Sequence, residues 1–308
     1  MKAKSTTLHT LLSVMVLSAF PLVPDTTQAK SPSIYPNDGQ GMARVEQALV
    51  RAQIDNKRVL LKIGGDWCGW CHKLHDVFNK DQALRSLLRD EYVLVMIENQ
   101  ADKAVLEKWN IHPDGYPYLA VLDASGTKLT EQETGSLEIG PRHDPAKVKA
   151  FLDKWTPVPW DARTLLEQSL STAKKEDKQV FFRVGAPTCG WCVRLDQFLA
   201  RPGVRTTLER DFVILKIDVQ RMTGGREVAE QVRQTTSGGI PWFAFLAPDG
   251  RVLQTSNNAQ GNNIGFPVRP DTEIRHFRNM LMGARKHMTP DDVTSVIEEL
   301  KLFTKPWQ

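Results

Sequence analysis

Two cysteine tetrads are the residues of this chain best suited to chemistry. They are Cys68-Gly69-Trp70-Cys71 and Cys189-Gly190-Trp191-Cys192, and the 308 residues contain no other cysteine. A disulfide that closes so short a loop constrains the unfolded chain very little, so structural cross-linking explains neither pair well. Two thiols three residues apart are suited to dithiol–disulfide exchange, because the second can attack a mixed disulfide formed by the first. We expect a redox-active centre at each tetrad, with the first cysteine as nucleophile and the second as the resolving thiol.

Each tetrad lies where a buried strand is expected to end and a helix to begin. Short apolar runs precede the tetrads at 59–63 and 180–184, and apolar residues at helical spacing follow them. The backbone N–H groups and the dipole at a helix N-terminus favour negative charge. This setting predicts that the pKa of the first cysteine is lowered, which favours the reactive thiolate.

The chain is an internal duplication. Both tetrads and the segments before them are related by an offset of 121 residues, and two later blocks repeat at offsets of 120 and 124. Each copy reads as helix, strand, tetrad, helix, strand and strand, which indicates an α/β fold with a parallel strand pair and a closing hairpin. The repeated blocks are 52–64 and 173–185, 93–98 and 213–218, and 116–122 and 240–246.

The second copy carries additional residues. The polar segment 254–270 is expected to be a long loop, which either flanks the second tetrad or has no order of its own. Two helices are predicted after it, the second with Thr289 as N-cap and Pro290 as its first residue. These helices are expected to cover a face of the sheet.

The tetrads and the prolines downstream of them resemble the active-site region of the thioredoxin family. Residues 65–74 with Tyr116-Pro117 carry this pattern, and residues 186–195 with Ile240-Pro241 repeat it. The resemblance implies two tandem thioredoxin-like domains, each a central mixed sheet flanked by helices, with cis prolines that face the sulfurs. It also implies a client groove formed by Trp67, Trp70, Tyr116, Pro117, Trp191, Ile240 and Pro241.

Three departures from that family pattern concern the chemistry. Gly-Trp stands between the cysteines where Gly-Pro is common in the family, which leaves the direction of electron flow open. The buried strand acid of the family is replaced by Lys62 and Arg183, whose side chains either favour the thiolate or extend outward to solvent. Thr188 replaces the aromatic Trp67 in the second copy, so the two sites are expected to differ.

Other functions use the same residues. Cys68, Cys71 and His72 match a c-type haem attachment motif, although Val193 replaces the histidine in the second copy. Four cysteines also suit a zinc site, but the two pairs are far apart in the sequence. The last alternative is a thioredoxin-fold scaffold or chaperone that binds without catalysis. We favour dithiol–disulfide exchange, with no cofactor and no metal.

The first residues predict export. Lys2 and Lys4 precede the apolar run 11–20, and Thr27-Gln28-Ala29 offers a cleavage site, so residues 1–29 are typical of a signal peptide. The run is too short for a stable membrane span, so none is expected after cleavage. The predicted domains are residues 30–156 and residues 157–308, the second with a C-terminal helical extension.

Location and composition limit the partners. We expect a periplasmic or secreted protein that acts on client proteins or peptides with thiols or disulfides and exchanges electrons with a further redox donor or acceptor. A net charge of +4 gives no reason to expect nucleic acid.

Overall fold

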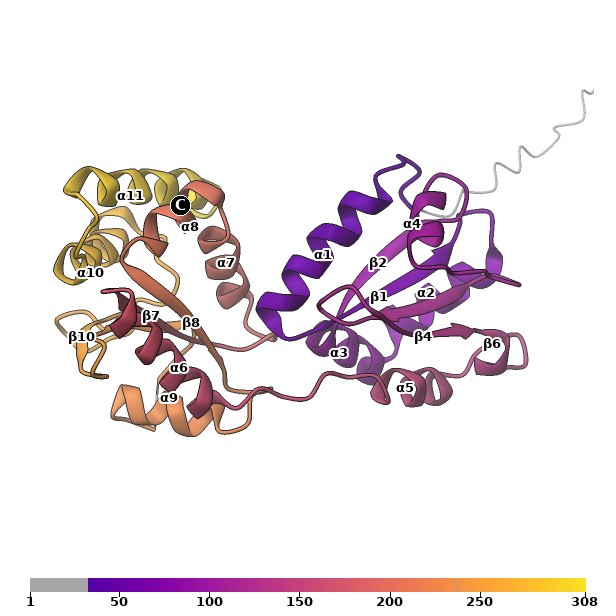
Figure 1. Cartoon of the computed structure of the whole chain (residues 1–308), viewed down its shortest axis with the longest axis horizontal. Helices are drawn as coiled ribbons and strands as arrows, with labels where there is room; N and C mark the ends of the chain where they lie inside the picture. The colour runs from indigo at the N-terminus through magenta and orange to yellow at the C-terminus, as the bar shows by residue number, and fades with distance from the viewer. Residues whose placement is uncertain (1–32, 237) are drawn as a thin grey trace, which may run out of the picture. The chain divides into compact units, whose positions relative to one another are not determined.

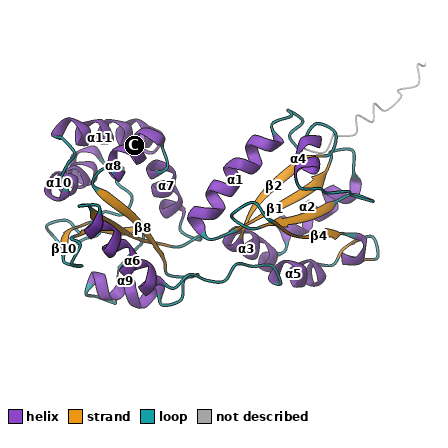
Figure 2. Ribbon diagram, in the orientation of Figure 1, coloured by secondary structure: helices purple, strands orange, loops and turns teal. Residues whose placement is uncertain are grey.

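The computed structural model describes residues 33–236 and 238–308 and contains a four-stranded sheet in each half of the chain (Figure 1). The predicted signal peptide lies outside the described residues. Helices and strands alternate along both halves, and Figure 2 shows the strands of each half with helices beside them.

The elements of the first half follow the predicted order. They are α1 (Gly41–Asp55), β1 (Arg58–Gly64), α2 (Gly69–Lys80), α3 (Gln82–Glu91), β2 (Tyr92–Glu98), α4 (Lys103–Lys108), β3 (Tyr118–Leu122), β4 (Lys128–Glu133), η1 (Gly135–Leu137), β5 (Glu138–Ile139), β6 (Arg142–His143) and α5 (Pro145–Asp153).

The second half repeats this order as far as the hairpin and then continues with helices alone. Its elements are α6 (Ala162–Lys175), β7 (Gln179–Gly185), α7 (Gly190–Leu199), α8 (Pro202–Glu209), β8 (Phe212–Asp218), α9 (Gly225–Arg233), β9 (Trp242–Leu246), β10 (Val252–Thr255), η2 (Pro270–Ile274), α10 (Arg275–Ala284), α11 (Pro290–Thr304) and η3 (Lys305–Trp307).

The two sheets have the same topology. Their strand orders are β2-β1-β3-β4 and β8-β7-β9-β10, and in both the first two strands are parallel while the others pair antiparallel. The register also repeats, since Val59 lies opposite Val93 and Val180 lies opposite Val213. The predicted α/β class, parallel pair and hairpin are therefore confirmed.

Both faces of each sheet are buried, which explains the nearly continuous apolar runs of the central strands. In the first half, α1 and α4 pack on one face, and α2, α3 and α5 pack on the other. In the second half, α6 and α9 cover one face, while α7, α8, α10 and α11 cover the other. The second helix of each crossover, α3 or α8, was not predicted, because it follows the preceding helix within one or two residues. The short helices α4 and α9 were not predicted either.

The helical extension of the second half covers the sheet as expected. Phe277 and Leu281 of α10 and Val296 of α11 belong to the same buried cluster as Phe243 and Phe245 of β9. The side chain of Thr289 accepts a hydrogen bond from the backbone N–H of Asp292, so the predicted N-cap of α11 is present. Among the described residues, no helix is long and apolar enough to span a membrane.

Candidate active sites

The first cysteine of each tetrad is the N-cap of the helix that follows it. Sγ of Cys68 accepts a hydrogen bond of 3.1 Å from the backbone N–H of Cys71, at the start of α2. Cys189 and Cys192 repeat this contact, also at 3.1 Å, at the start of α7. An N–H group and the positive end of a helix dipole aimed at sulfur both favour a thiolate on the first cysteine.

Both tetrads are closed as disulfides in this structure, Cys68–Cys71 and Cys189–Cys192. Cys68, Cys71 and Cys192 are buried and Cys189 is partly exposed, but the small exposed part of the first tetrad belongs to Cys68, at 6% against 0% for Cys71. In both halves an incoming molecule therefore meets the first cysteine before the second.

A glycine at the end of each central strand makes room for the buried cysteine. A Cβ atom on Gly64 would lie 2.5 Å from Sγ of Cys71. The equivalent atom on Gly185 would lie 3.2 Å from Cβ and 3.3 Å from Sγ of Cys192. The first of these positions has no room for a larger residue.

The two prolines lie in the loops before β3 and β9, and both Tyr116–Pro117 and Ile240–Pro241 are cis peptides, as the resemblance implies. Sγ of Cys189 lies 3.6 Å from the carbonyl oxygen of Ile240, so this loop faces the second tetrad. In the first half, Tyr116 packs against the cluster that contains Cys68 and Cys71. The structure thus brings each predicted proline loop to its tetrad.

Aromatic side chains surround the first tetrad. Trp67 is 64% exposed and meets Tyr116 edge to face, with ring centroids 5.6 Å apart. Trp70 meets His143 edge to face at 5.4 Å, and Nζ of Lys73 lies 4.0 Å from the Trp70 ring centroid. The predicted groove residues of the first site therefore separate into a Trp67–Tyr116 pair and a Trp70 ring that contacts His143 and Lys73.

Lys62 reaches the first site instead of extending to solvent. Its side chain is fully buried, and Nζ donates a hydrogen bond of 3.0 Å to the carbonyl oxygen of Cys71. The ammonium also lies 4.6 Å from the ring centroid of Tyr35. Burial lowers the pKa of Lys62 to about 7, and the nearby Asp66 carboxylate opposes this shift only in part. An amine that titrates near neutrality therefore lies beneath Cys71.

His143 is a second buried titratable group at the first site, and no pattern in the sequence indicated it. Neither ring nitrogen has a hydrogen-bond partner among the described residues. Burial lowers the pKa of His143 to about 4, and the charges of Lys62 and Lys73 act in the same direction. The imidazole is therefore neutral at pH 7.

Arg183, the counterpart of Lys62, has a different environment. It is buried and forms an ion pair with Asp196 of α7, which also accepts a hydrogen bond from Nζ of Lys216. Burial lowers the pKa of Arg183 to about 10, so the guanidinium stays charged at neutral pH. Position 75 of α2 corresponds to Asp196, and His75 there offers Lys62 no negative charge. The buried cation thus contacts the second cysteine in the first half and a carboxylate in the second.

The second tetrad is flanked by aromatic residues from the helical extension. Trp191 stacks on Phe266, with centroids 6.0 Å apart, and meets Trp307 edge to face at 6.4 Å. The guanidinium of Arg194 lies 4.0 Å from the Trp307 ring centroid. Thr188, which replaces the exposed tryptophan, accepts a hydrogen bond from the amide of Gln220. Phe266 and Trp307 lie far from the tetrad in sequence, so no local spacing could have identified them.

In the structure, the residues that haem or zinc would use can be examined directly for such a site. Nε2 of His72 lies 2.9 Å from the carbonyl oxygen of Asp66. Within residues 33–236 and 238–308, no group of three or more His, Cys, Asp or Glu side chains is arranged to hold a metal ion.

Family models match both halves of the chain. Residues 40–124 match a model described as thioredoxin-like. Residues 147–299 match the model Thioredox_DsbH, described as a protein of unknown function, DUF255. The chain is a tandem thioredoxin-like protein. The resemblance to the thioredoxin family and the predicted α/β fold class are confirmed by these matches together with the two repeated sheets.

Curated relatives resemble parts of this tandem thioredoxin-like chain. "Protein disulfide-isomerase 1" of Dictyostelium discoideum is 26% identical over 200 residues, which are 63% of this chain and 53% of that protein. "Spermatogenesis-associated protein 20" of Homo sapiens is 30% identical over 86 residues, which are 27% of this chain and 11% of that protein. The chain thus spans about half of the first relative and a small part of the second.

Among solved structures, a disulphide isomerase from Xylella fastidiosa Temecula1 is similar, with 20% identity and a TM-score of 0.36. The matched region covers 40% of this thioredoxin-like chain and 97% of that structure.

Proposed function

We propose that the chain is an exported thiol–disulfide oxidoreductase that acts on protein or peptide clients at Cys68–Cys71 and Cys189–Cys192. One observation carries the proposal. In both halves the sulfur of the first cysteine accepts a hydrogen bond from the backbone N–H of the second cysteine at a helix N-terminus, where a thiolate is favoured. The match to a protein disulfide-isomerase supports the same chemistry.

The exchange proceeds in two displacements when the reduced protein meets a client disulfide. The thiolate of Cys68 or Cys189 attacks one client sulfur, the client S–S bond breaks, and the departing thiolate takes up a proton. Cys71 or Cys192 then loses its proton and attacks the mixed disulfide, which closes the protein disulfide and releases the second client thiol. Two electrons pass from protein to client. One of the two protons that the client thiols take up comes from Cys71 or Cys192 and the other from solvent, and the reverse sequence oxidises a client dithiol.

The residues around each tetrad are proposed to bind the client. Trp67, Trp70, Tyr116 and Pro117 form the groove of the first site, and the proline loop holds the client backbone beside the sulfur. Trp191, Ile240 and Pro241 have this role at the second site. The pKa of Lys62 supports proton transfer at the first site, because an amine that titrates near 7 can accept the thiol proton of Cys71 during the second displacement.

The direction of exchange depends on the reduction potential of each tetrad relative to a redox donor or acceptor that restores it. Separate potentials, measured in variants that keep a single tetrad, assign each site as a reductant or an oxidant.

Insulin reduction in the presence of dithiothreitol tests the activity. The wild-type protein is expected to accelerate precipitation of the insulin B chain, and the Cys68→Ala/Cys189→Ala variant is expected to lose this acceleration. The exposed-residue variant Leu302→Ala is a control and should match wild type. Equal activity of the double cysteine variant and wild type would reject the enzyme and favour the scaffold alternative.

Export is tested separately. Residues 1–35 fused to a reporter enzyme that is active only outside the cytoplasm should give activity and a mature chain that begins near Lys30. Substitution of Leu11 and Leu12 by Asp should abolish both, because an apolar core is required for export. Activity of the reporter without residues 1–29 would contradict the proposal.

A further inference from the structure

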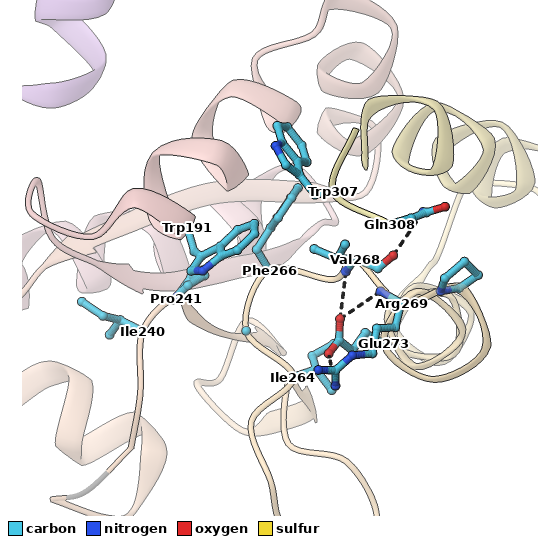
Figure 3. Close-up of a pocket in the computed structure, with 12 residues that line it drawn as sticks. Trp191, Ile240, Pro241, Ile264, Phe266, Val268, Arg269, Glu273, Trp307 and Gln308 are labelled. Carbon is cyan, nitrogen blue, oxygen red and sulfur yellow. Dashed lines mark hydrogen bonds and ion pairs between the residues drawn. The ribbon is translucent and has the colours of Figure 1, made fainter. Parts of the chain in front are cut away.

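A pocket of about 460 Å³ opens beside the second tetrad (Figure 3). Trp191 and the Ile240–Pro241 peptide form one side, and residues 264–270 form another. Trp307 and Gln308 also contribute to the lining. The volume lies in the range of ordinary ligand sites, about 300–1,000 Å³.

Hydrogen bonds hold the walls of this pocket in place. The side-chain amide of Asn263 donates to the carbonyl oxygens of Pro241, at 2.9 Å, and Gly239, at 3.2 Å. Oε2 of Glu273 accepts from the backbone N–H groups of Val268 and Arg269. The segment 254–270 is therefore an ordered flank of the second site, and it presents a surface that need not reorganise on binding.

The pocket is lined by aromatic rings and has basic groups at its edge. Trp191, Phe266 and Trp307 contact one another, and the guanidinium of Arg194 lies 5.6 Å from the ring centroid of Trp191. The side chain of Arg269 is 80% exposed, and its guanidinium forms an ion pair of 3.2 Å with Oε1 of Glu273 (Figure 3). Glu273 therefore neutralises Arg269, whereas Arg194 forms no ion pair among the described residues. The positive charge of Arg194 beside the rings favours an acidic group on the ligand.

Two of the residues that line the pocket, Trp191 and Ile240, adjoin the reactive disulfide. Trp191 lies between Cys189 and Cys192 in the sequence, and the carbonyl oxygen of Ile240 is 3.6 Å from Sγ of Cys189. A polypeptide joined to Cys189 by a mixed disulfide therefore passes the pocket within a few residues of its own cysteine. In the first half the equivalent Trp70 ring is covered by His143 and Lys73 instead.

We propose that this pocket receives a client side chain, so that the second site prefers clients with a large apolar residue near the reacting cysteine and an acidic residue beside it. An aromatic ring fits best, because it can meet Trp191, Phe266 and Trp307 edge to face. This inference rests on the proposed function and adds a substrate class that applies to the second site alone.

Peptide disulfides measure this preference in the full chain with only the second tetrad active, the Cys68→Ser/Cys71→Ser variant. Matched peptides carry Trp or Ala two residues before the cysteine, next to either Glu or Lys, each with the same leaving thiol. The second-order rate constant for the Trp-Glu peptide is expected to exceed that for the Ala-Glu peptide by about tenfold, and Lys in place of Glu should lower it.

Pocket variants test the assignment. Trp307→Ala and Phe266→Ala should reduce the tenfold preference to less than about threefold, and Trp307→Phe should retain most of it. Leu302→Ala, an exposed apolar position of α11 outside the pocket, should leave it unchanged. The preference should also be absent when only the first tetrad is active, in the Cys189→Ser/Cys192→Ser variant.

A disulfide without side chains separates failure of the pocket from failure of the enzyme. Bis(2-hydroxyethyl) disulfide should react equally with all pocket variants. If it reacts while Trp and Ala peptides do so at equal rates, the pocket inference is overturned and the proposed function stands. If it does not react at Cys189, both are overturned. If selectivity appears only after removal of residues 1–33, that segment occupies the pocket. If it appears only on dilution, a second copy of the chain occupies it. Either result would reject our inference.

Discussion

Lys62 donates a hydrogen bond of 3.0 Å from Nζ to the carbonyl oxygen of Cys71, although no part of its side chain is exposed. A buried ammonium is unfavourable, and burial lowers the pKa of Lys62 from its usual 10.5 to about 7. The first active site therefore contains an amine that destabilises the fold and titrates where thiol chemistry takes place.

This burial predicts a stability difference that depends on pH. Between pH 7 and 10.5 the unfolded chain holds a proton on Lys62 that the folded chain has lost, so this group makes the fold more stable as pH rises. Lys62→Met is expected to raise the free energy of unfolding at pH 7 by about 2–4 kcal/mol and to have little effect near pH 10.5. Urea unfolding of the oxidised protein at both values measures the difference.

Lys80→Met is the matched control, because Lys80 is exposed and pairs with the exposed Asp76 one turn away. The free energy of unfolding of Lys80→Met should differ from that of wild type by less than about 0.5 kcal/mol at either pH. A Lys62→Met gain that is the same at pH 7 and at pH 10.5 would contradict the titration of Lys62.

The same lysine is expected to tune thiol reactivity in the reduced protein. A positive charge in a buried site favours a nearby thiolate, so Lys62→Met should raise the apparent pKa of the reactive thiol of the first tetrad by about 0.5–1 unit. The pH dependence of iodoacetamide alkylation in the Cys189→Ser/Cys192→Ser background reports this value. Alkylation of the second tetrad in a separate Cys68→Ser/Cys71→Ser background, with and without Lys62→Met, is the reference and should not change.

Gly64 and Gly185 provide a matched pair of substitutions. Alanine at 64 places a Cβ 2.5 Å from Sγ of Cys71, whereas alanine at 185 meets Cys192 at 3.2 Å. Gly64→Ala is expected to destabilise the oxidised protein by about 2 kcal/mol or more, and Gly185→Ala by about half of that or less. Thermal or urea unfolding checks the ranking, and equal losses would show that the first site relaxes more easily than its packing indicates.

His143 predicts sensitivity to acid. Burial holds its pKa at about 4, below the usual 6.5, so the unfolded chain binds more protons between these values. This group therefore lowers the free energy of unfolding as pH drops from 6.5 to 4, and it causes no such loss above pH 6.5. His143→Leu should therefore lose less stability than wild type between pH 6.5 and 4, by about 1–3 kcal/mol in urea unfolding.

The exposed His112 is the reference for that measurement. His112→Asn should follow the wild-type pH dependence. Identical acid curves for wild type and His143→Leu would mean that the imidazole is protonated in the folded protein.

Much of the fold could be predicted because the same sequence pattern occurs twice in the chain. The apolar runs before the tetrads, the prolines after them and the near-constant offset define one α/β unit that occurs two times. Local sequence signals are sufficient for such elements, since a buried strand and an amphipathic helix are recognised from neighbouring residues.

The environment of each site could not be predicted in the same way. Lys62 and Arg183 stand at equivalent positions of the two copies, but which group each contacts depends on His75 and Asp196, each on the helix that follows the strand. His143, Phe266 and Trp307 reach the tetrads only through tertiary packing. Contacts of this kind leave no periodic trace in one sequence, so the two sites were expected to differ without any indication of how.

Asp211 ties the helical extension to the second sheet and gives the last prediction. Its carboxylate is fully buried and accepts hydrogen bonds of 2.7–3.1 Å from the backbone N–H groups of Lys286, His287 and Met288, which join α10 to α11. Asp211→Ala leaves three donors without their acceptor, so a loss of about 3–5 kcal/mol in unfolding free energy is expected. Asp249→Ala, which removes one exposed hydrogen bond to Arg251, should cost less than about 1 kcal/mol.

The same variant links the extension to client choice. Because α10 and α11 position Phe266 and Trp307, Asp211→Ala should also weaken the preference for the Trp peptide while leaving exchange with bis(2-hydroxyethyl) disulfide near the wild-type rate. Urea unfolding and the peptide rate ratio measure the two effects on one preparation. Full retention of the preference in a destabilised Asp211→Ala protein would show that the pocket keeps its shape without this anchor.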